Sequence, residues 1–146
     1  MSSTKVPLPN HNFVPEYQQS GIPFVTGSSN LDDEDIHHIQ LPTVSRWFVV
    51  HSTGNGNNQI RVGFTENGVK GTSEGQETNN YYVVHTGEQT SKLELKVKDI
   101  YIANFSGADN LSYSLIAGLT GVPRNSFPTL TGSLEENGVK VLTGVG

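Results

Sequence analysis

The chain has 146 residues, about the length of one domain, and its hydrophobic fraction of only 34% is typical of short strands that alternate with many turns. It holds no cysteine, which excludes disulfide bridges and thiolate metal sites, and its formal net charge of −5 argues against general binding to nucleic acid. No run of about 18 apolar residues occurs, and the N-terminus lacks the apolar stretch of a signal peptide, so we expect no direct membrane insertion.

The first 21 residues are polar and are interrupted by Pro7, Pro9 and Pro15. Because proline fixes φ and has no N–H to donate, this segment is predicted to be an extended arm rather than a helix. Such an arm could dock on a partner subunit or on the chain's own core, and the sequence leaves both alternatives open.

From Ile22 onward, short apolar runs separated by turn residues predict β-strands. The alternation is clearest in Lys92–Lys98, where Leu93, Leu95 and Val97 are expected to face the core while the charged residues between them face outward. The eight predicted strands are Ile22–Thr26, Asp35–Leu41, Thr43–Ser52, Gln59–Thr65, Tyr81–Thr86, Lys92–Lys98, Asp99–Phe105 and Leu111–Leu119. The other side chains expected on inner faces are Ile39, Leu41, Val44, Phe48, Val50, Ile60, Val62, Phe64, Ile100, Ile102, Leu111, Tyr113, Leu115 and Ala117.

Two Asn-Gly pairs mark expected hairpins, because both residue types tolerate the positive φ of a tight turn. Asn67-Gly68 is expected to close a hairpin after the fourth strand, and Asn137-Gly138 is expected to join Thr129–Glu135 to Val139–Thr143. No window has an apolar stripe at helical period, so little helix is expected.

Eight strands with turn signals between them predict an all-β antiparallel sandwich, and a jelly roll is the eight-stranded form in two sheets. The expected organisation is an extended arm over residues 1–21, a jelly-roll domain over 22–122 and a C-terminal extension over 123–146. That extension is expected to pack on the body or to reach a neighbouring molecule.

Histidines and an acidic run are the candidates for metal binding. His37 and His38 are adjacent, so on a strand they face opposite sides and cannot chelate together. His51 and His85 each end a strand, but no third ligand stands at a telling spacing. The acidic run 32–35 lacks the central glycine and distal glutamate of a helix–loop–helix calcium site. A solvated loop is therefore favoured, and a weak calcium site formed with other loops or between subunits is the alternative.

No motif of a nucleophilic serine, a cysteine nucleophile or a phosphate-binding loop is present, and no spacing fixes a catalytic triad. We therefore expect no enzyme, no catalytic or metal site and no cofactor. The alternative of a metalloenzyme on a jelly-roll scaffold would require His51 and His85 side by side within the fold. Trp47, on the face opposite Phe48, and the pair Tyr81 and Tyr82 suggest a carbohydrate-stacking surface or a subunit interface, because an exposed aromatic patch marks an interaction site.

A family resemblance spans residues 36–122. Its pieces, in chain order, are Leu41–Val50, Ile60–Val69, Asn80–Val84, Leu93–Ile102 and Ser114–Gly121. This succession resembles the small single jelly-roll capsid proteins of large icosahedral double-stranded DNA viruses, in particular their vertex, or penton, proteins. The segment after Gly121 is not required by that pattern, which leaves open a different minor capsid, fibre or decoration protein.

The resemblance implies a structural role in the virion. The chain would form a homopentamer at each fivefold vertex of the capsid, contact neighbouring capsid proteins and assemble in the host cytoplasm. The proline-rich arm and the C-terminal extension would be tethers to neighbouring subunits. The alternative is a carbohydrate-binding β-sandwich module for attachment to a host.

Overall fold

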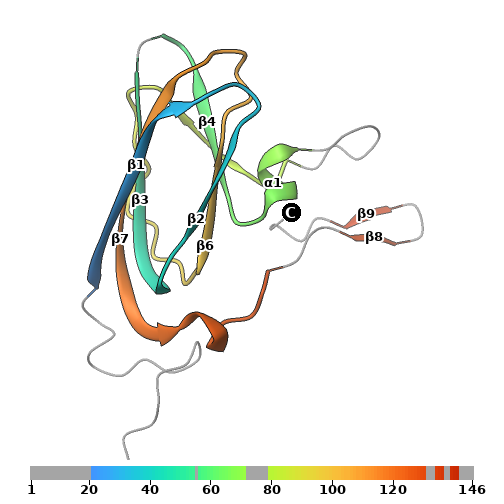
Figure 1. Cartoon of the computed structure of the whole chain (residues 1–146). Coiled ribbons are helices and arrows are strands. Elements are labelled where there is room, and N and C mark those ends of the chain that lie inside the picture. The colour runs from blue at the N-terminus through green and yellow to red at the C-terminus, as the bar shows by residue number, and fades with distance from the viewer. Residues whose placement is uncertain (1–20, 55, 72–78, 131–133, 137–138, 142–146) are drawn as a thin grey trace, which may run out of the picture.

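The computed structural model describes residues 21–54, 56–71, 79–130, 134–136 and 139–141. These residues form two antiparallel sheets packed face to face, one short helix and a small hairpin set apart from the sheets (Figure 1). The predicted all-β antiparallel sandwich is confirmed. Apart from Gly21, the predicted arm over residues 1–21 lies outside the described residues.

The first sheet has the order β1-β7-β3, with β7 (Leu111–Pro123) in the centre between β1 (Ile22–Leu31) and β3 (Thr43–Thr53). Alternate residues of β7 face the second sheet, because successive side chains of a strand point to opposite faces. The inner-face residues Leu111, Tyr113, Leu115 and Ala117 are buried, as predicted. The strand continues past its predicted end at Leu119, and bulges in its pairing with β3 accommodate the extra length.

The second sheet has the order β2-β6-β4-β5. Its strands are β2 (Ile36–Gln40), β6 (Asp99–Ala103), β4 (Gln59–Gly63) and β5 (Tyr82–His85). The core lies between the two sheets. Of the side chains predicted there, Ile39, Leu41, Val44, Phe48, Val50, Ile60, Val62, Ile100 and Ile102 are buried, and Phe64 packs partly buried against them.

The predicted sixth strand, Lys92–Lys98, is wrong as a regular strand, so the described sandwich has seven strands rather than eight. Residues 88–97, here called the edge segment, nevertheless follow the free edge of β3. Phe48 and Leu93 exchange backbone hydrogen bonds of 2.9 and 3.0 Å, and Thr90 N donates to the β3 carbonyl of Val50 at 2.9 Å. The edge segment is therefore an irregular fourth member of the first sheet.

A local kink explains why the alternation failed there. The backbone N–H of Leu95 donates to the carbonyl of Leu93 at 3.0 Å, which bends the chain and leaves Leu95 42% exposed instead of inward. The buried hydroxyl of Ser45 fills the gap in the pairing, because it donates to the Leu95 carbonyl at 2.7 Å and accepts from Val97 N at 3.1 Å.

The predicted hairpin at Asn67-Gly68 is also wrong, because residues Glu66–Lys70 form the short helix α1. The Thr65 hydroxyl caps it by accepting from Gly68 N at 3.0 Å. Val69 is buried against the outer face of the second sheet at Gly63, where a side chain on the glycine would collide with it. The next described strand in the chain, Tyr82–His85, still pairs with β4, so the two strands are neighbours without a tight turn between them.

The C-terminal hairpin is confirmed in shorter form, with β8 (Leu134–Glu136) antiparallel to β9 (Val139–Val141). A single 3-10 turn, η2 (Arg124–Ser126), follows β7 directly. Figure 1 places the hairpin to one side of the sandwich, beyond α1.

Candidate functional site

An apolar surface lies on the outer side of the first sheet. Cross-strand neighbours share a face, and two rows run across the three strands there. The row nearer the start of β1 joins Pro23 to Gly118 and Trp47, and the next row joins Val25 to Ile116 and Val49. We call the five side chains of this surface, Pro23, Val25, Trp47, Val49 and Ile116, the β1 face.

Trp47 lies across β7 because two glycines make room for it. A Cβ at Gly118 would overlap Trp47 Nε1 and come within 2.6 Å of its Cε2, and the backbone of Gly21 packs on the other side of Gly118. The indole is consequently half-buried, on the face opposite Phe48 as predicted, and apart from Trp47 Nε1 the two rows offer no side-chain hydrogen-bonding group.

Substituting Gly118 with alanine is expected to lower the free energy of unfolding by about 1 kcal/mol, because the added methyl overpacks the site. Since Trp47 is the only tryptophan, its fluorescence should shift towards the spectrum of an indole in water as the ring is displaced. Denaturant unfolding and emission spectra measure the two effects. Ser114→Ala, on the same face of β7 and exposed, is the matched control; an unchanged Trp47 spectrum in Gly118→Ala would contradict the packing described.

The edge of the sandwich farthest from β1 carries a groove, which we call the β5 groove. It opens between β5 and the edge segment and encloses about 310 Å³. Its lining residues are Val62, Phe64, Asn79, Asn80, Tyr81, Tyr82 and Leu93. Tyr82 faces the groove and is exposed, whereas the Tyr81 ring is covered on one side by the Arg61 guanidinium, 4.3 Å from the ring centre. The aromatic residues predicted as an interaction site therefore divide between two separate surfaces.

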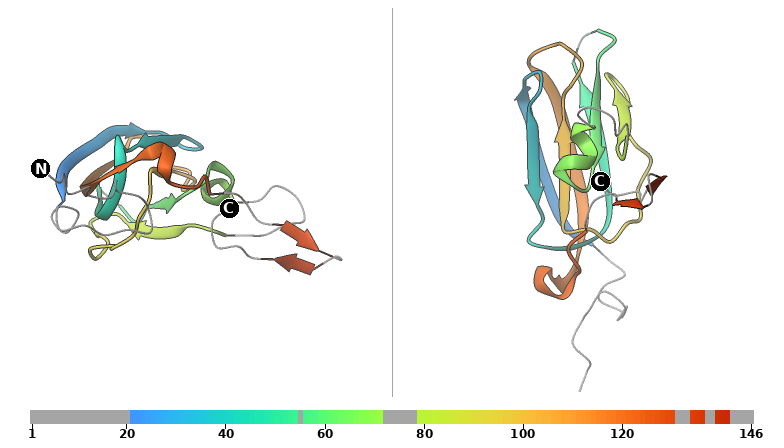
Figure 2. Two further views of the ribbon diagram at one scale, coloured as in Figure 1. Left: turned by 90° about the horizontal axis from the view of Figure 1, so that it is seen from below. Right: turned by 90° about the vertical axis from the view of Figure 1, so that its right-hand side faces the viewer.

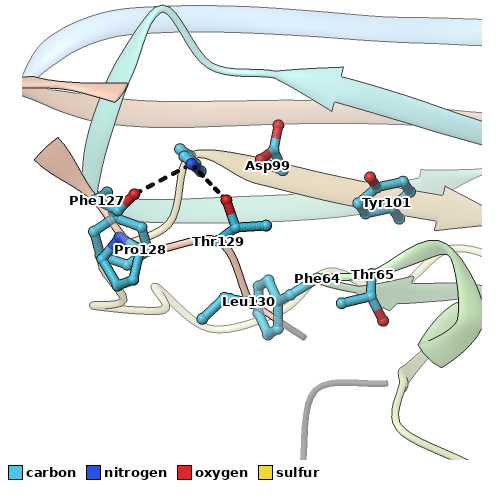
Figure 3. A pocket seen from close by; sticks show the side chains of 9 residues that line it. Phe64, Thr65, Asp99, Tyr101, Phe127, Pro128, Thr129 and Leu130 are labelled. Atoms are coloured by element: carbon cyan, nitrogen blue, oxygen red, sulfur yellow. Dashed lines mark hydrogen bonds between the residues drawn. The ribbon is translucent and has the colours of Figure 1, made fainter. Parts of the chain in front are cut away.

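A smaller pocket of about 130 Å³ lies between β6, the start of α1 and residues 127–130 (Figure 3). Lys98 Nζ spans it, donating to the Phe127 carbonyl at 3.2 Å and to Thr129 Oγ1 at 3.4 Å. The ammonium group therefore holds the C-terminal segment against β6. This contact is structural, and the pocket is lined on one side by residues 127–130.

Asp99 joins three segments beside that pocket. Its Oδ1 lies 2.9 Å from His38 Nε2 and 2.8 Å from Arg124 Nη2. Burial raises the Asp99 pKa, but the hydrogen bonds from Arg124 and His38, together with their charges, outweigh it, so the pKa lies below its ordinary value. Arg124 Nη1 also donates to the carbonyls of Leu41 and Lys98 at 2.7 and 2.5 Å. The arginine thus ties the end of β7, in the first sheet, to the second sheet.

The four histidines among the described residues are spread over both sheets. His37 points towards the core side, with Nδ1 2.9 Å from the Tyr113 hydroxyl, and His38 points outward and stacks on Tyr101. The two therefore face opposite sides, as predicted. His51 lies in the first sheet and His85 in the second, opposite Gln59. Within the described part of the chain, no three histidine or acidic side chains are grouped so as to hold a metal ion.

Carboxylates of the acidic run accept hydrogen bonds from the backbone of another loop as well as facing solvent. Asp33 Oδ1 accepts from Gly107 N at 2.8 Å, Asp32 Oδ1 accepts from Asn110 N at 3.1 Å, and Asp109 Oδ1 accepts from Asp33 N at 3.1 Å. These contacts fasten the β1–β2 loop to the β6–β7 loop. Sequence reasoning foresaw an exposed loop but had no signal for its partner, which is 76 residues away in the chain.

Beneath these carboxylates, Asn104 is fully buried and links the same two loops. Its Nδ2 donates to the carbonyls of Leu31 and Ala108 at 3.0 and 2.6 Å, and its Oδ1 accepts from the backbone and hydroxyl of Ser106. We call the two loops and this asparagine the loop clamp. It closes one end of the sandwich, and Arg124 closes the other.

No helix among the described residues combines the length and apolar content needed to cross a bilayer. No protein-family model and no curated protein sequence matches this chain. The functional interpretation therefore rests on the order of the strands and on the two apolar surfaces, the β1 face and the β5 groove.

Proposed function

We propose that this chain is a structural capsid subunit built on a jelly roll, and that it forms the homopentameric vertex of an icosahedral virus particle. The order of strand pairing supports the jelly roll. The first strand pairs with the last, β2 pairs with β6, β3 with the edge segment and β4 with β5. Such nested pairing is what results when one long hairpin is wound into two sheets.

The uncovered apolar surfaces support assembly as the function. Large exposed hydrophobic side chains cost free energy in water, and where they gather on a folded domain they mark a contact with another molecule. They lie on β1 and β7 of the first sheet and on β5 and the edge segment, whereas the two ends of the sandwich are closed by the loop clamp and by Arg124. Neighbouring capsid proteins and further copies of this chain are the proposed partners, and the virion, assembled in the host cytoplasm, is the proposed location.

The copy number and symmetry of the chain in its native particle test this proposal. We expect image reconstruction of the particle to place five copies around each fivefold axis, with strands roughly upright and each contact between copies burying more than about 1,000 Å². Density for the chain on threefold or general positions, or its absence from purified particles, would overturn the vertex assignment.

A carbohydrate-binding role is the second candidate, and the β5 groove favours it. Exposed Tyr82 offers an aromatic face to a sugar ring, and the amides of Asn79 and Asn80 lie in the same groove. Binding to a glycan array that is lost in Tyr82→Ala and kept in Trp47→Ala would support this role. Loss in Trp47→Ala instead would contradict the assignment to this groove.

A further inference from the structure

We propose that copies of this chain join head to tail, with the β1 face of one copy packed into the β5 groove of the next. This inference rests on the proposed assembly function and names the two surfaces that would meet. It does not depend on the number of copies in the final ring.

The large exposed apolar side chains of the described residues fall into two groups, one on β1 and the adjacent strand β7 and the other on β5 and the edge segment. Ile22, Val25 and Ile116 are 58%, 68% and 43% exposed and belong to β1 and β7, whereas Tyr82 (61%) and Leu95 (42%) belong to β5 and the edge segment. The strand orders place β1 and β2 at one edge of the sandwich and β5 and the edge segment at the other. The right-hand view of Figure 2 shows these edges on opposite sides of the molecule.

The two surfaces match in chemistry. No charged residue occurs from Ile22 to Leu31, and none lines the β5 groove, although the chain as a whole is 16% charged. A charge buried in an interface without a partner costs several kcal/mol, so two uncharged surfaces can close on each other where a charged surface could not. Protruding Val25 on one edge faces outward, and the groove on the other edge has room for aliphatic side chains.

Strand edges point to the same pair of surfaces. β1 is ten residues long and carries no pairing on its outer edge among the described residues, whereas β2 and β5 have five and four residues. The edge segment is interrupted by its kink and carries Lys92, Glu94 and Lys96, features that discourage continued pairing. β1 is thus the one long, uncharged edge in the described sandwich, and a second copy of this chain is the partner that carries a matching uncharged groove.

A contact between two different surfaces is heterologous. It leaves each added copy with one free surface of each kind, so the series must either close into a ring or grow as a filament. A contact of the β1 face with itself would instead stop at a dimer. The two arrangements give opposite results when damaged copies are mixed, which allows a direct test.

The test uses the full chain with one surface damaged at a time. Val25→Asp places a charge on the β1 face and Tyr82→Asp places one at the β5 groove, and both side chains are exposed, so the fold should be kept. Asn57→Asp, exposed and in the loop between β3 and β4, adds the same charge outside both surfaces and is the control. Sedimentation over a range of concentrations measures the mass, and circular dichroism checks the fold.

We expect the unchanged chain and Asn57→Asp to assemble beyond the dimer, and each surface variant alone to remain monomeric. An equimolar mixture of the two variants should give a complex of two chains and nothing larger, because Tyr82→Asp keeps its β1 face and Val25→Asp keeps its β5 groove. Dimers of Tyr82→Asp alone would overturn the inference in favour of a symmetric contact. Normal assembly of both variants would show that these two surfaces are not the contact between copies. The vertex proposal would still stand, because it is tested separately in the particle.

Discussion

Replacing Asn104 with alanine is expected to lower the free energy of unfolding by about 3 kcal/mol, the largest effect of any polar substitution in the described fold. The carboxamide makes four hydrogen bonds in a fully buried position, two through each end. Its removal leaves the carbonyls of Leu31 and Ala108 and the N–H of Ser106 without their partner, and an unsatisfied buried polar group costs about 1–3 kcal/mol. Urea unfolding followed by circular dichroism measures the loss.

Two further variants separate the contributions at Asn104. Ser106→Ala removes only the hydroxyl contact to Oδ1 and should cost about 1 kcal/mol. Asn104→Asp keeps the shape but places a carboxylate against two carbonyl oxygens, so at neutral pH it should be at least as destabilising as the alanine. Equal stability of Asn104→Ala and the unchanged chain would show that water replaces the asparagine, and the account of the loop clamp would then be wrong.

Arg124→Ala should lower the free energy of unfolding at pH 7 by about 2–3 kcal/mol. The guanidinium donates to two backbone carbonyls and to the Asp99 carboxylate, and hydrogen bonds that involve a charged group contribute more than neutral ones. Partial exposure of both side chains limits the electrostatic part through solvent screening. A double-mutant cycle with Asp99→Asn measures the coupling between the two residues, and a coupling near zero would contradict a role for this pair.

The same pair predicts how stability changes in acid. Because the folded-state pKa of Asp99 is depressed below its ordinary value of 3.8, the carboxylate contributes stability above that pH and loses it as the pH falls through the lower, folded-state value. Arg124→Ala removes the hydrogen-bond partner that lowers this pKa most. The difference in stability between the variant and the unchanged chain should therefore shrink as the pH falls from about 5 to about 2. Chemical denaturation at both pH values measures it.

Alternation of apolar and polar residues predicted the buried side chains correctly where one face of a strand is buried along its whole length. Leu111, Tyr113, Leu115 and Ala117 have period two, and the sheet covers every one of them. The same pattern gave a wrong prediction at Leu95. Alternation carries no information about the backbone hydrogen bond from Leu95 to Leu93, which bends the chain and turns the Leu95 side chain outward. Propensity for local structure therefore predicted the sheet, and tertiary pairing decided where the strand breaks.

The Asn67-Gly68 pair failed for a related reason. A tight hairpin requires that the following residues pair back with β4, but both edges of β4 are taken by β5 and β6. Thr65 and Glu66 supply a helix cap and an acidic first turn, so the local sequence supported a helix once that pairing was unavailable. An Asn-Gly signal is conditional on a free neighbouring edge, which one sequence cannot reveal.

The candidate surfaces were foreseen only in outline. Trp47, Tyr81 and Tyr82 were expected to include an interaction site, and Trp47 lies on the outer side of the first sheet whereas Tyr82 lines the β5 groove. No spacing rule brings Val25 and Ile116 together, because they meet only through the pairing of β1 with β7. The contacts of Asn104 and Arg124 are long-range in the same way, and single polar residues in a loop or after a strand carry no periodic signal.

Because of the loop clamp, the loops at that end of the sandwich should differ in how well they tolerate an inserted peptide. The β1–β2 and β6–β7 loops are joined through Asp33, Gly107 and Asn104. Lengthening either loop would therefore disrupt the hydrogen bonds that hold it to the other. Gly56 and Asn57 are exposed in the neighbouring β3–β4 loop, outside the loop clamp. A foreign epitope for display, or a fluorescent tag for following the protein in cells, belongs between Gly56 and Asn57. Exchange of the clamped loops with another scaffold would have to move both together.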